Sequence, residues 1–463
     1  LLLCGAKDAI TLKLKDGSYS GSWNLGQWKS ALKQLPLLIT SESENAELVK
    51  LTSSQNTIIL NDNQNITFEN ITIKNQNAYV VTIQNGAKNI VFNHCKLLSD
   101  TTTSSPNKAC IYKENDNGLI DSIFLKNSLL NGGYYGFCFE GKLSSIYRTS
   151  LYIDSNTFVN QANSAIRIKC ADFVSVICNN ILSRKDNVNA YWTAINIDSV
   201  NANIFANSIK QRISTIGYPC GISASFCGSK RYKTQIINNT IQLYNNVTAI
   251  GIDMGFTHAD IFHNTIKINE LGDNRGISIN ALSECKIAIK NNIIDLFSGY
   301  PIYLLDTFSM YNLEFAYNNY YSPDAIAYAS KKIVSLASWQ QLIPNDTNSI
   351  SILPQYEESL LKPKTILPYL CPRINTVDKD INNCLRDSCT IMGAYSQTTS
   401  TFDLALVSFK NIPTSLIAKQ QIPLEVEIIN LGKTNNIVID NYRILFANVF
   451  KTKFDLNIKI NEE

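Results

Sequence analysis

The chain has 463 residues, and its 41 basic and 38 acidic side chains leave a formal net charge of +3 without any run of Lys and Arg. That balance argues against nucleic acid as the main partner. No apolar stretch approaches the length of a membrane span. A single compact core is not expected to enclose a chain of this length, so the sequence predicts an elongated repeat with a second domain.

Residues 1–56 predict irregular N-terminal coils. ITLKLKDGSYSG, residues 10–21, alternates apolar and polar side chains and then turns at Asp16 and Gly17, which is typical of a strand followed by a corner. PLLITSESENAELVKL, residues 36–51, resumes the same rhythm as a second, less regular coil.

Residues 57–324 contain a repeat in which Asn, any residue and an apolar residue recur every twenty-three to thirty-four positions. A short alternating segment lies about a dozen residues before each Asn, as in AIRIK and GISIN, and a second one just before it, as in SVICN and KIAIKN. The pattern has period two and no helical period. The marked residues are Asn70, Asn93, Asn127, Asn156, Asn179, Asn207, Asn239, Asn264, Asn291 and Asn318.

Each unit of this repeat has too little apolar surface to form a core alone. Units must therefore stack, and a fixed repeat of short strands predicts a solenoid. We expect each Asn to occupy a sharp corner, because Asn tolerates left-handed backbone angles, and to bond to its counterparts in a ladder along the stack.

Motifs at both ends of the repeat resemble the right-handed parallel β-helix proteins of the pectate-lyase-like superfamily, especially large secreted bacterial ones. At the N-terminal end, Asp16, Gly17 and Tyr19 match the superfamily's opening phrase. The sequence around Gly393, Ala394 and Tyr395 is similar to its closing phrase, although Ile391 and Ser396 replace acidic residues there. The exit pattern is matched by Trp339, Asp346, Asn348, Ser349 and the run Pro354, Gln355 and Tyr356.

This resemblance covers residues 7–396 and implies an all-β, right-handed parallel β-helix of about 11–12 coils. We expect the β-helix to span residues 1–396, with regular coils over 57–324 and an exit segment over 325–396. The same architecture carries lyases, hydrolases, adhesins and tail spikes, so it does not fix an activity.

The sequence pattern changes after residue 396, where the asparagine-marked repeat no longer occurs, and this predicts a second domain. Residues 397–401 are a polar linker, and residues 402–463 contain alternating segments separated by Pro, Gly and Asn turns. They resemble the immunoglobulin-like modules that follow β-helices in secreted bacterial proteins. Some sixty residues hold fewer strands than a full sandwich needs, so the natural chain is expected to continue past Glu463.

Aligning the first strands on their inward aliphatic pairs, including Ile250 with Ile252, predicts two outward rows of side chains. Lys113 joins the second row in one of two registers that differ by one residue. The first row is Thr82, Cys138, Arg167, Asn196, Ser223, Gly251 and Ser278. The second row is Gln84, Glu140, Lys169, Asp198, Ser225, Asp253 and Asn280.

Glu140, Arg167, Lys169 and Asp198 form the most polar patch of these rows, and they are the candidate catalytic residues. β-Elimination on a uronate glycan needs a base, often Lys or Arg, and a cation or Ca²⁺ to neutralise the sugar carboxylate, which suits Lys169 with Arg167. Hydrolysis needs two carboxylates, which suits Asp198 with Glu140 or Asp253.

A structural alternative is that the same charges pair across adjacent rungs, Glu140 with Lys169 and Lys169 with Asp198. Outward charges on a sheet are usually a solvated face, which favours this alternative. The two interpretations differ in geometry. An enzyme needs these side chains at the floor of a groove, whereas a stripe of mutually paired charges argues against catalysis.

Flanking loops carry aromatic residues that are candidates for stacking on sugar rings, with loop packing as the alternative. The candidate substrate-binding residues are Tyr134, Tyr135, Tyr191, Trp192, Tyr218 and Asp253.

No metal site is expected, because His94, His258 and His263 are poorly grouped for ligation. We expect no cofactor, except Ca²⁺ if the protein is a lyase. The sequence predicts a secreted or cell-surface protein acting in adhesion, glycan binding or as a stalk, with a polysaccharide lyase and then a glycoside hydrolase as alternatives. Expected partners are a polysaccharide or cell-surface glycan and, through the C-terminal module, other surface proteins.

Overall fold

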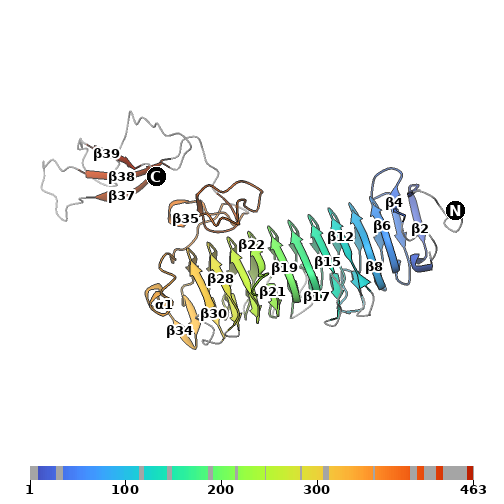
Figure 1. The fold of residues 1–463 in the computed structure, drawn as a ribbon, viewed down its shortest axis with the longest axis horizontal. Helices are drawn as coiled ribbons and strands as arrows, with labels where there is room; N and C mark the ends of the chain where they lie inside the picture. Colours follow the sequence, from blue (N-terminus) through green and yellow to red (C-terminus); the bar gives the residue numbers. More distant parts are fainter. Residues whose placement is uncertain are drawn as a thin grey trace. The chain divides into compact units, whose positions relative to one another are not determined.

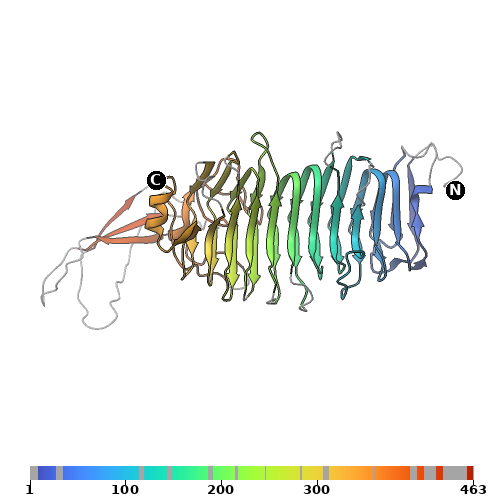
Figure 2. The same ribbon diagram turned by 90° about the horizontal axis from the view of Figure 1, so that it is seen from below.

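The protein is an all-β parallel solenoid in the part of the chain that the structure describes. The computed structural model describes residues 9–27, 35–113, 119–142, 149–185, 191–213, 217–245, 247–281, 284–305, 312–357 and 360–396, and three strands beyond them. Successive strands lie side by side along the solenoid axis (Figures 1 and 2). The predicted fold class is confirmed.

Two sheets run the length of the solenoid. The larger has 22 strands and contains the first and second strands of each coil, such as β17 (Ser164–Ile177) and β19 (Thr193–Phe205), which pair in parallel. The smaller has 12 strands, which follow one another in chain order from β2 (Gly17–Ser20) and β5 (Val49–Thr52) to β32 (Asn319–Tyr321). The solenoid makes about ten turns, and β2 and β5 belong to the irregular coils at its N-terminal end.

Columns of aliphatic side chains fill the interior. One column consists of side chains that are at most 1% exposed, and each fully buried aliphatic side chain contributes roughly 1.5–3 kcal/mol relative to an exposed one. This column places six inward residues of successive coils in register: Phe137, Ile166, Ile195, Ile222, Ile252 and Ile277.

The predicted register is wrong in one coil, and in another the structure selects one of the two registers left open. Ile252 and Met254 pair with inward residues of the next coil, so the expected inward pair Ile250 and Ile252 is displaced by two residues. Lys113 pairs with Ile83 and Phe139 and is 2% exposed, so it lies on the inward side of its strand and not in an outward row.

The predicted asparagine ladder is present. Asn207 is typical: its Nδ2 donates to Asn239 Oδ1 at 3.0 Å and to the carbonyl of Val176 at 2.8 Å. Its own Oδ1 accepts from the backbone and side-chain amides of Asn179, both at 3.0 Å. Ladder members are Asn156, Asn179, Asn207, Asn239, Asn264, Asn292 and Asn318.

The left-handed residue of each corner is the one before the ladder position. Ala206, for example, has φ 55°, and Asn207 follows it. Asn70, Asn127 and Asn291 are themselves left-handed corner residues, so Asn292 and not Asn291 is the ladder member of its coil. Asn93 is in neither position and donates to Glu69 at 2.7 Å.

The C-terminal end of the solenoid is closed by the exit segment. Helix α1 (Leu336–Leu342) begins after Ser335, whose hydroxyl accepts from the backbone amide of Ser338. Trp339 is fully buried, and its Nε1 donates to Asp346 Oδ2 at 2.7 Å. Ser349 Oγ accepts from the backbone amide of Asn318 at 2.9 Å and so continues the ladder beyond its last asparagine.

Residues 371–396, which we call the strap, lie along the flank of the solenoid. Their contacts include a small apolar cluster in which Val377 packs with Ile237, Phe262 and Ala288. The sequence did not predict this arrangement.

The chain divides into two compact units, residues 1–364 with 371–396 and residues 365–370 with 397–463. In the second unit β38 (Leu424–Asn430) pairs antiparallel with β37 (Leu404–Lys410) and parallel with β39 (Leu456–Asn461). These strands form one three-stranded sheet. The described residues of this unit contain no second sheet of the kind a sandwich requires.

Candidate functional site

The outward face of the first strands carries the predicted polar patch. Glu140 ends β14 (Tyr135–Glu140), Arg167 and Lys169 lie in β17, and Asp198 lies in β19. The strand register places Glu140 beside Lys169 and Lys169 beside Asp198, as the alignment predicted. Because neighbouring strands are about 4.8 Å apart, the four side chains form one continuous patch.

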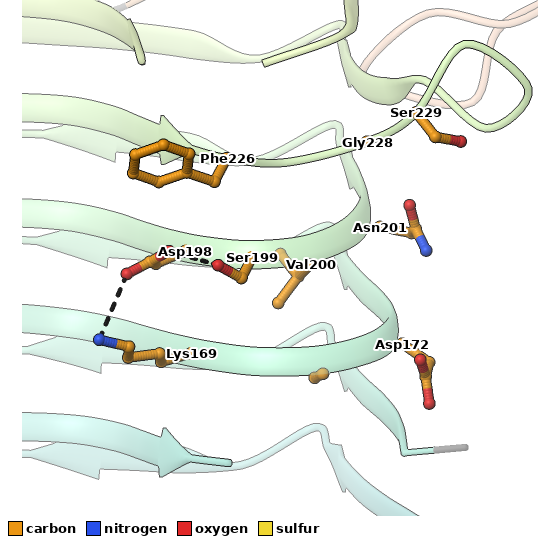
Figure 3. Close-up of a pocket in the computed structure, with 10 residues that line it drawn as sticks. Lys169, Asp172, Asp198, Ser199, Val200, Asn201, Phe226, Gly228 and Ser229 are labelled. Carbon is orange, nitrogen blue, oxygen red and sulfur yellow. Dashed lines mark hydrogen bonds and ion pairs between the residues drawn. The ribbon is translucent and has the colours of Figure 1, made fainter. Parts of the chain in front are cut away.

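Within this patch the charges pair with one another. Arg167 Nε lies 3.4 Å from Glu140 Oε1, and Lys169 Nζ lies 3.6 Å from Asp198 Oδ2. The predicted pair of Lys169 with Asp198 is confirmed, whereas Glu140 selects Arg167, diagonally across the strands, and not the directly opposite Lys169. Asp198 also accepts from Ser199 Oγ at 2.8 Å (Figure 3).

Arg167 is held in its charged form. Burial alone would lower the pKa of its guanidinium, but Tyr135, Cys138 and Glu140 together raise that pKa above its ordinary value. The guanidinium carbon lies 5.8 Å from the centre of the Tyr135 ring, and burial raises the pKa of Tyr135 to about 12. A general base must be available to accept a proton, and this environment makes Arg167 a poorer base.

An open hollow of about 750 Å³ lies beside the Lys169–Asp198 pair (Figure 3). Lys169, Asp198 and Ser199 line one part of it, and Asp172 and Asn201 lie farther along the coil surface. Neither Arg167 nor Glu140 lines the hollow. The predicted patch is therefore split, because two of its four residues, Lys169 and Asp198, line this hollow.

Phe226 forms another part of the hollow and was not predicted. It is 61% exposed and stacks on Phe256 with ring centres 5.2 Å apart. Both residues occupy left-handed corners, with φ 53° and 50°. A bulky residue is uncommon there, and unusual backbone conformations cluster at functional sites. The signal in the sequence was a bulky side chain at a corner that elsewhere holds Ser199 or Asn85.

The predicted aromatic residues fall into three environments. Tyr191 and Tyr218 are 60% and 48% exposed and stack on each other with ring centres 5.6 Å apart. Tyr134 and Tyr135 meet edge to face at 4.7 Å and are partly buried. Trp192 is 5% exposed and packs in the apolar core, so it presents no ring face to a ligand.

Asp253 lies in the first outward row, between Ser223 and Ser278, and not in the second row with Asp198. This change follows from the displaced register of β24 (Ile250–Gly255). Burial raises the pKa of the Asp253 carboxyl, while a hydrogen bond from Ser278 and the charge of Arg275 act in the opposite direction. The structure therefore does not join Asp253 to the Lys169–Asp198 pair.

A tyrosine cluster farther along the same face was also missed. The guanidinium carbon of Arg275 lies 3.8 Å from the centre of the Tyr303 ring, and Tyr303 stacks on Tyr328 at 4.9 Å. Tyr300 meets both rings edge to face. These tyrosines were missed because the predicted outward rows end at Ser278 and Asn280, one coil before Tyr300 and Tyr303.

Among the residues that the structure describes, no group of three His, Cys, Asp or Glu side chains converges as a metal site requires. His258 Nδ1 accepts from the backbone amide of Lys286, whereas His263 is buried on the flank under the strap. In the same part of the chain, no helix is both long and apolar enough to cross a membrane.

Comparison with known proteins gives no assignment: no family model matches the chain, and no curated protein matches it at a significant level.

Proposed function

We propose that this chain is a secreted or cell-surface β-helix protein of the pectate-lyase-like superfamily that binds glycans without cleaving them. The observation that carries the proposal is the pairing of the outward charges, Arg167 with Glu140 and Lys169 with Asp198. A catalytic acid, base or carboxylate clamp must be free to meet the substrate. Charges that pair across neighbouring strands instead form a polar surface, which we call the polar floor, on which a glycan can bind.

Exposed aromatic rings support binding to saccharides. Tyr191 and Tyr218 form one exposed stack, and Phe226 rises at the hollow. An aromatic face offers apolar area to the C–H face of a sugar, and Tyr adds a polar tip. Carboxylates and amides in the hollow, including Asp172 and Asn201, are suited to accept or donate hydrogen bonds to hydroxyl groups.

The C-terminal unit is proposed to be an immunoglobulin-like module that serves as a spacer or contacts other surface proteins. Its support is the alternating pattern of β37, β38 and β39 and their arrangement in one sheet. A bacterial source and a stalk or adhesin role are part of the same proposal, since the resemblance is to secreted bacterial β-helix proteins.

A polysaccharide lyase is the second candidate, because Lys169 adjoins a hollow large enough for a sugar unit. In that case Lys169 would be the base and a cation such as Ca²⁺ would neutralise the uronate. The ion pair with Asp198 opposes this role, since it occupies the amino group that a base would have to present to the substrate.

The test is a binding screen on immobilised acidic and neutral polysaccharides, run alongside an assay for unsaturated products by ultraviolet absorbance. We expect binding without product formation. The double variant Tyr191→Ala with Tyr218→Ala should lose about two- to tenfold in affinity, from roughly 0.5–1.5 kcal/mol of stacking. Tyr152→Ala is the matched control, because Tyr152 is 39% exposed on the second-strand face.

Two outcomes would overturn the proposal. Product that forms with the wild type and disappears in Lys169→Ala would establish the lyase. Binding that weakens equally in the Tyr152 control would show that the Tyr191–Tyr218 stack is not the binding surface.

A further inference from the structure

The strap is joined to the solenoid by hydrogen bonds from its own backbone. The amide of Gly393 donates to the carbonyl of Asn291 at 2.7 Å, and the amide of Ala394 donates to Thr265 Oγ1 at 3.0 Å. Gly393 has φ 87°, and a Cβ there would lie 2.6 Å from Thr265 Oγ1. The close approach therefore requires glycine, and these two amides report directly on docking of the strap.

A histidine is buried beneath this contact. His263 is 0% exposed and occupies a left-handed corner with φ 54°. Its Nε2 lies 3.1 Å from Nδ2 of Asn291, which can only donate, so Nε2 accepts and the ring is neutral with its proton on Nδ1. The backbones of Gly393 and Ile391 in the strap also face the ring and act to raise the pKa of His263, against the effect of burial.

The strap places a guanidinium in the same buried cluster. Arg386 is 1% exposed and donates to Asn238 Oδ1 at 2.8 Å. The carboxylate of Asp380, also buried, balances that charge, so a proton on His263 would add an uncompensated positive charge. The charged and titratable groups around this cluster are Arg386, Asp380 and Cys371 from the strap and Lys290, with its partner Glu314, from the adjacent coil.

The direction of the pH effect follows from these contacts. Burial, followed by the charge of Arg386, holds the pKa of His263 well below its ordinary value of 6.5. The undocked state therefore binds a proton as the pH falls below about 6.5, while the docked state does not. Docking loses stability over that interval, by at most about tenfold in its equilibrium constant per pH unit for one proton.

We propose that residues 371–396 are an acid-sensitive latch, which protonation of His263 loosens from the flank of the solenoid. Loosening uncovers the apolar side chains of Ile237, Phe262 and Ala288, which Val377 covers at neutral pH. The latch does not depend on glycan binding, because its residues lie outside the first-strand face.

The test is hydrogen exchange of the full chain between pH 7.5 and 5.0, corrected for the intrinsic pH dependence of exchange. We expect protection of the Gly393 and Ala394 amides to fall by up to about tenfold per pH unit below pH 6.5. His263→Asn should remove most of this fall, and it suits the site because Asn238 and Asn291 occupy the equivalent left-handed corners. His94→Asn is the matched control, because His94 is an exposed histidine at the same kind of corner.

A wild-type protein whose strap protection is independent of pH would overturn the latch, as would the same fall in His263→Asn. A second measurement needs no variant: deuterium uptake at the imidazole C2 carbon, followed by mass spectrometry against pH, titrates each histidine separately. The titration midpoint of His263 should lie well below the ordinary histidine value of 6.5. A midpoint near 6.5 for His263 would also reject the proposal.

Discussion

Arg386 Nη2 donates to Asn238 Oδ1 at 2.8 Å although the two residues are 148 positions apart. The same guanidinium donates to the carbonyls of Gly393 and Ala394 at 2.9 and 3.1 Å. Burial lowers the pKa of Arg386 to about 10, which still leaves it charged at neutral pH. One side chain therefore both orders the turn of the strap and fastens that turn to the solenoid.

Replacing Arg386 with Met should release the strap. The substitution leaves Asn238 Oδ1 and the carbonyl groups of Gly393 and Ala394 without their donor, at about 1–3 kcal/mol for each buried group left unpaired. The measurement is the rate of limited proteolysis within residues 371–396 at neutral pH, compared with wild type. Arg231→Ala, at an exposed arginine, is the control and should leave that rate unchanged. Cleavage of Arg386→Met at the wild-type rate would show that Arg386 is not needed to hold the strap on the solenoid.

Asn207→Ala should destabilise the solenoid more than Asn207→Ser does. Alanine removes the bonds to Asn239 and Val176 and leaves the amides of Asn179 without their acceptor, at about 1–3 kcal/mol for each buried group left unpaired. Serine is tolerated at the ladder position, since Ser128 Oγ accepts from the amide of Cys95 there. Urea unfolding of the three proteins measures the difference.

An exposed asparagine supplies the control for that comparison. Asn89 donates to Asn65 Oδ1 at 2.9 Å on the surface and has φ 53°, so Asn89→Gly removes this bond without backbone strain and should shift the urea midpoint much less than Asn207→Ala. Equal shifts would mean that the buried ladder adds nothing beyond a surface hydrogen bond.

Much of this fold was predictable because its signals are local and repeated. The alternation of apolar residues gave the inward columns, and the recurring asparagine gave the ladder. Register failed at residues 250–254, because Ile250, Ile252 and Met254 offer two apolar pairs spaced equally well. Only the hydrogen bonds to the neighbouring coils select one pair, and that choice moves Asp253 from one outward row to the other.

The strap and the hollow were not predictable for a different reason. Arg386 meets Asn238 and Ala394 meets Thr265 across more than a hundred residues, and no pattern in the sequence joins those segments. The hollow left a local signal, the bulky Phe226 at a corner, but neither its left-handed angle nor its stacking on Phe256 could be read from that signal. Contacts between segments far apart in the chain follow no repeating pattern in the sequence, so periodicity cannot predict them.

Asp253→Asn should stabilise the protein at neutral pH. Because burial raises the folded-state pKa of Asp253, the folded protein binds a proton that the unfolded chain releases as the pH rises above about 3.8. The wild type therefore loses stability between pH 3.8 and its folded-state pKa, whereas the amide does not titrate. Urea midpoints at pH 7 and pH 3.5 should differ more in the wild type, and a parallel change in both proteins would contradict this assignment.

The pairing of Lys169 with Asp198 should contribute little to stability. Their side chains are 45% and 33% exposed, the 3.6 Å contact is long, and exposed pairs of this kind are typically worth 0–1 kcal/mol. A double-mutant cycle of Lys169→Ala and Asp198→Ala, measured by urea unfolding, should give a coupling energy within about that range, and it should weaken further in high salt. The Lys233–Asp260 pair, at 2.6 Å and with side chains 26% and 19% exposed, is the comparison cycle, and its coupling should be the larger.

A stronger coupling for Lys169 with Asp198 than for Lys233 with Asp260 would mean that the Lys169–Asp198 ion pair stabilises the folded protein substantially. Such a pair would resist opening to a ligand, and the polar floor proposed for glycan binding would then have to lie elsewhere on the face.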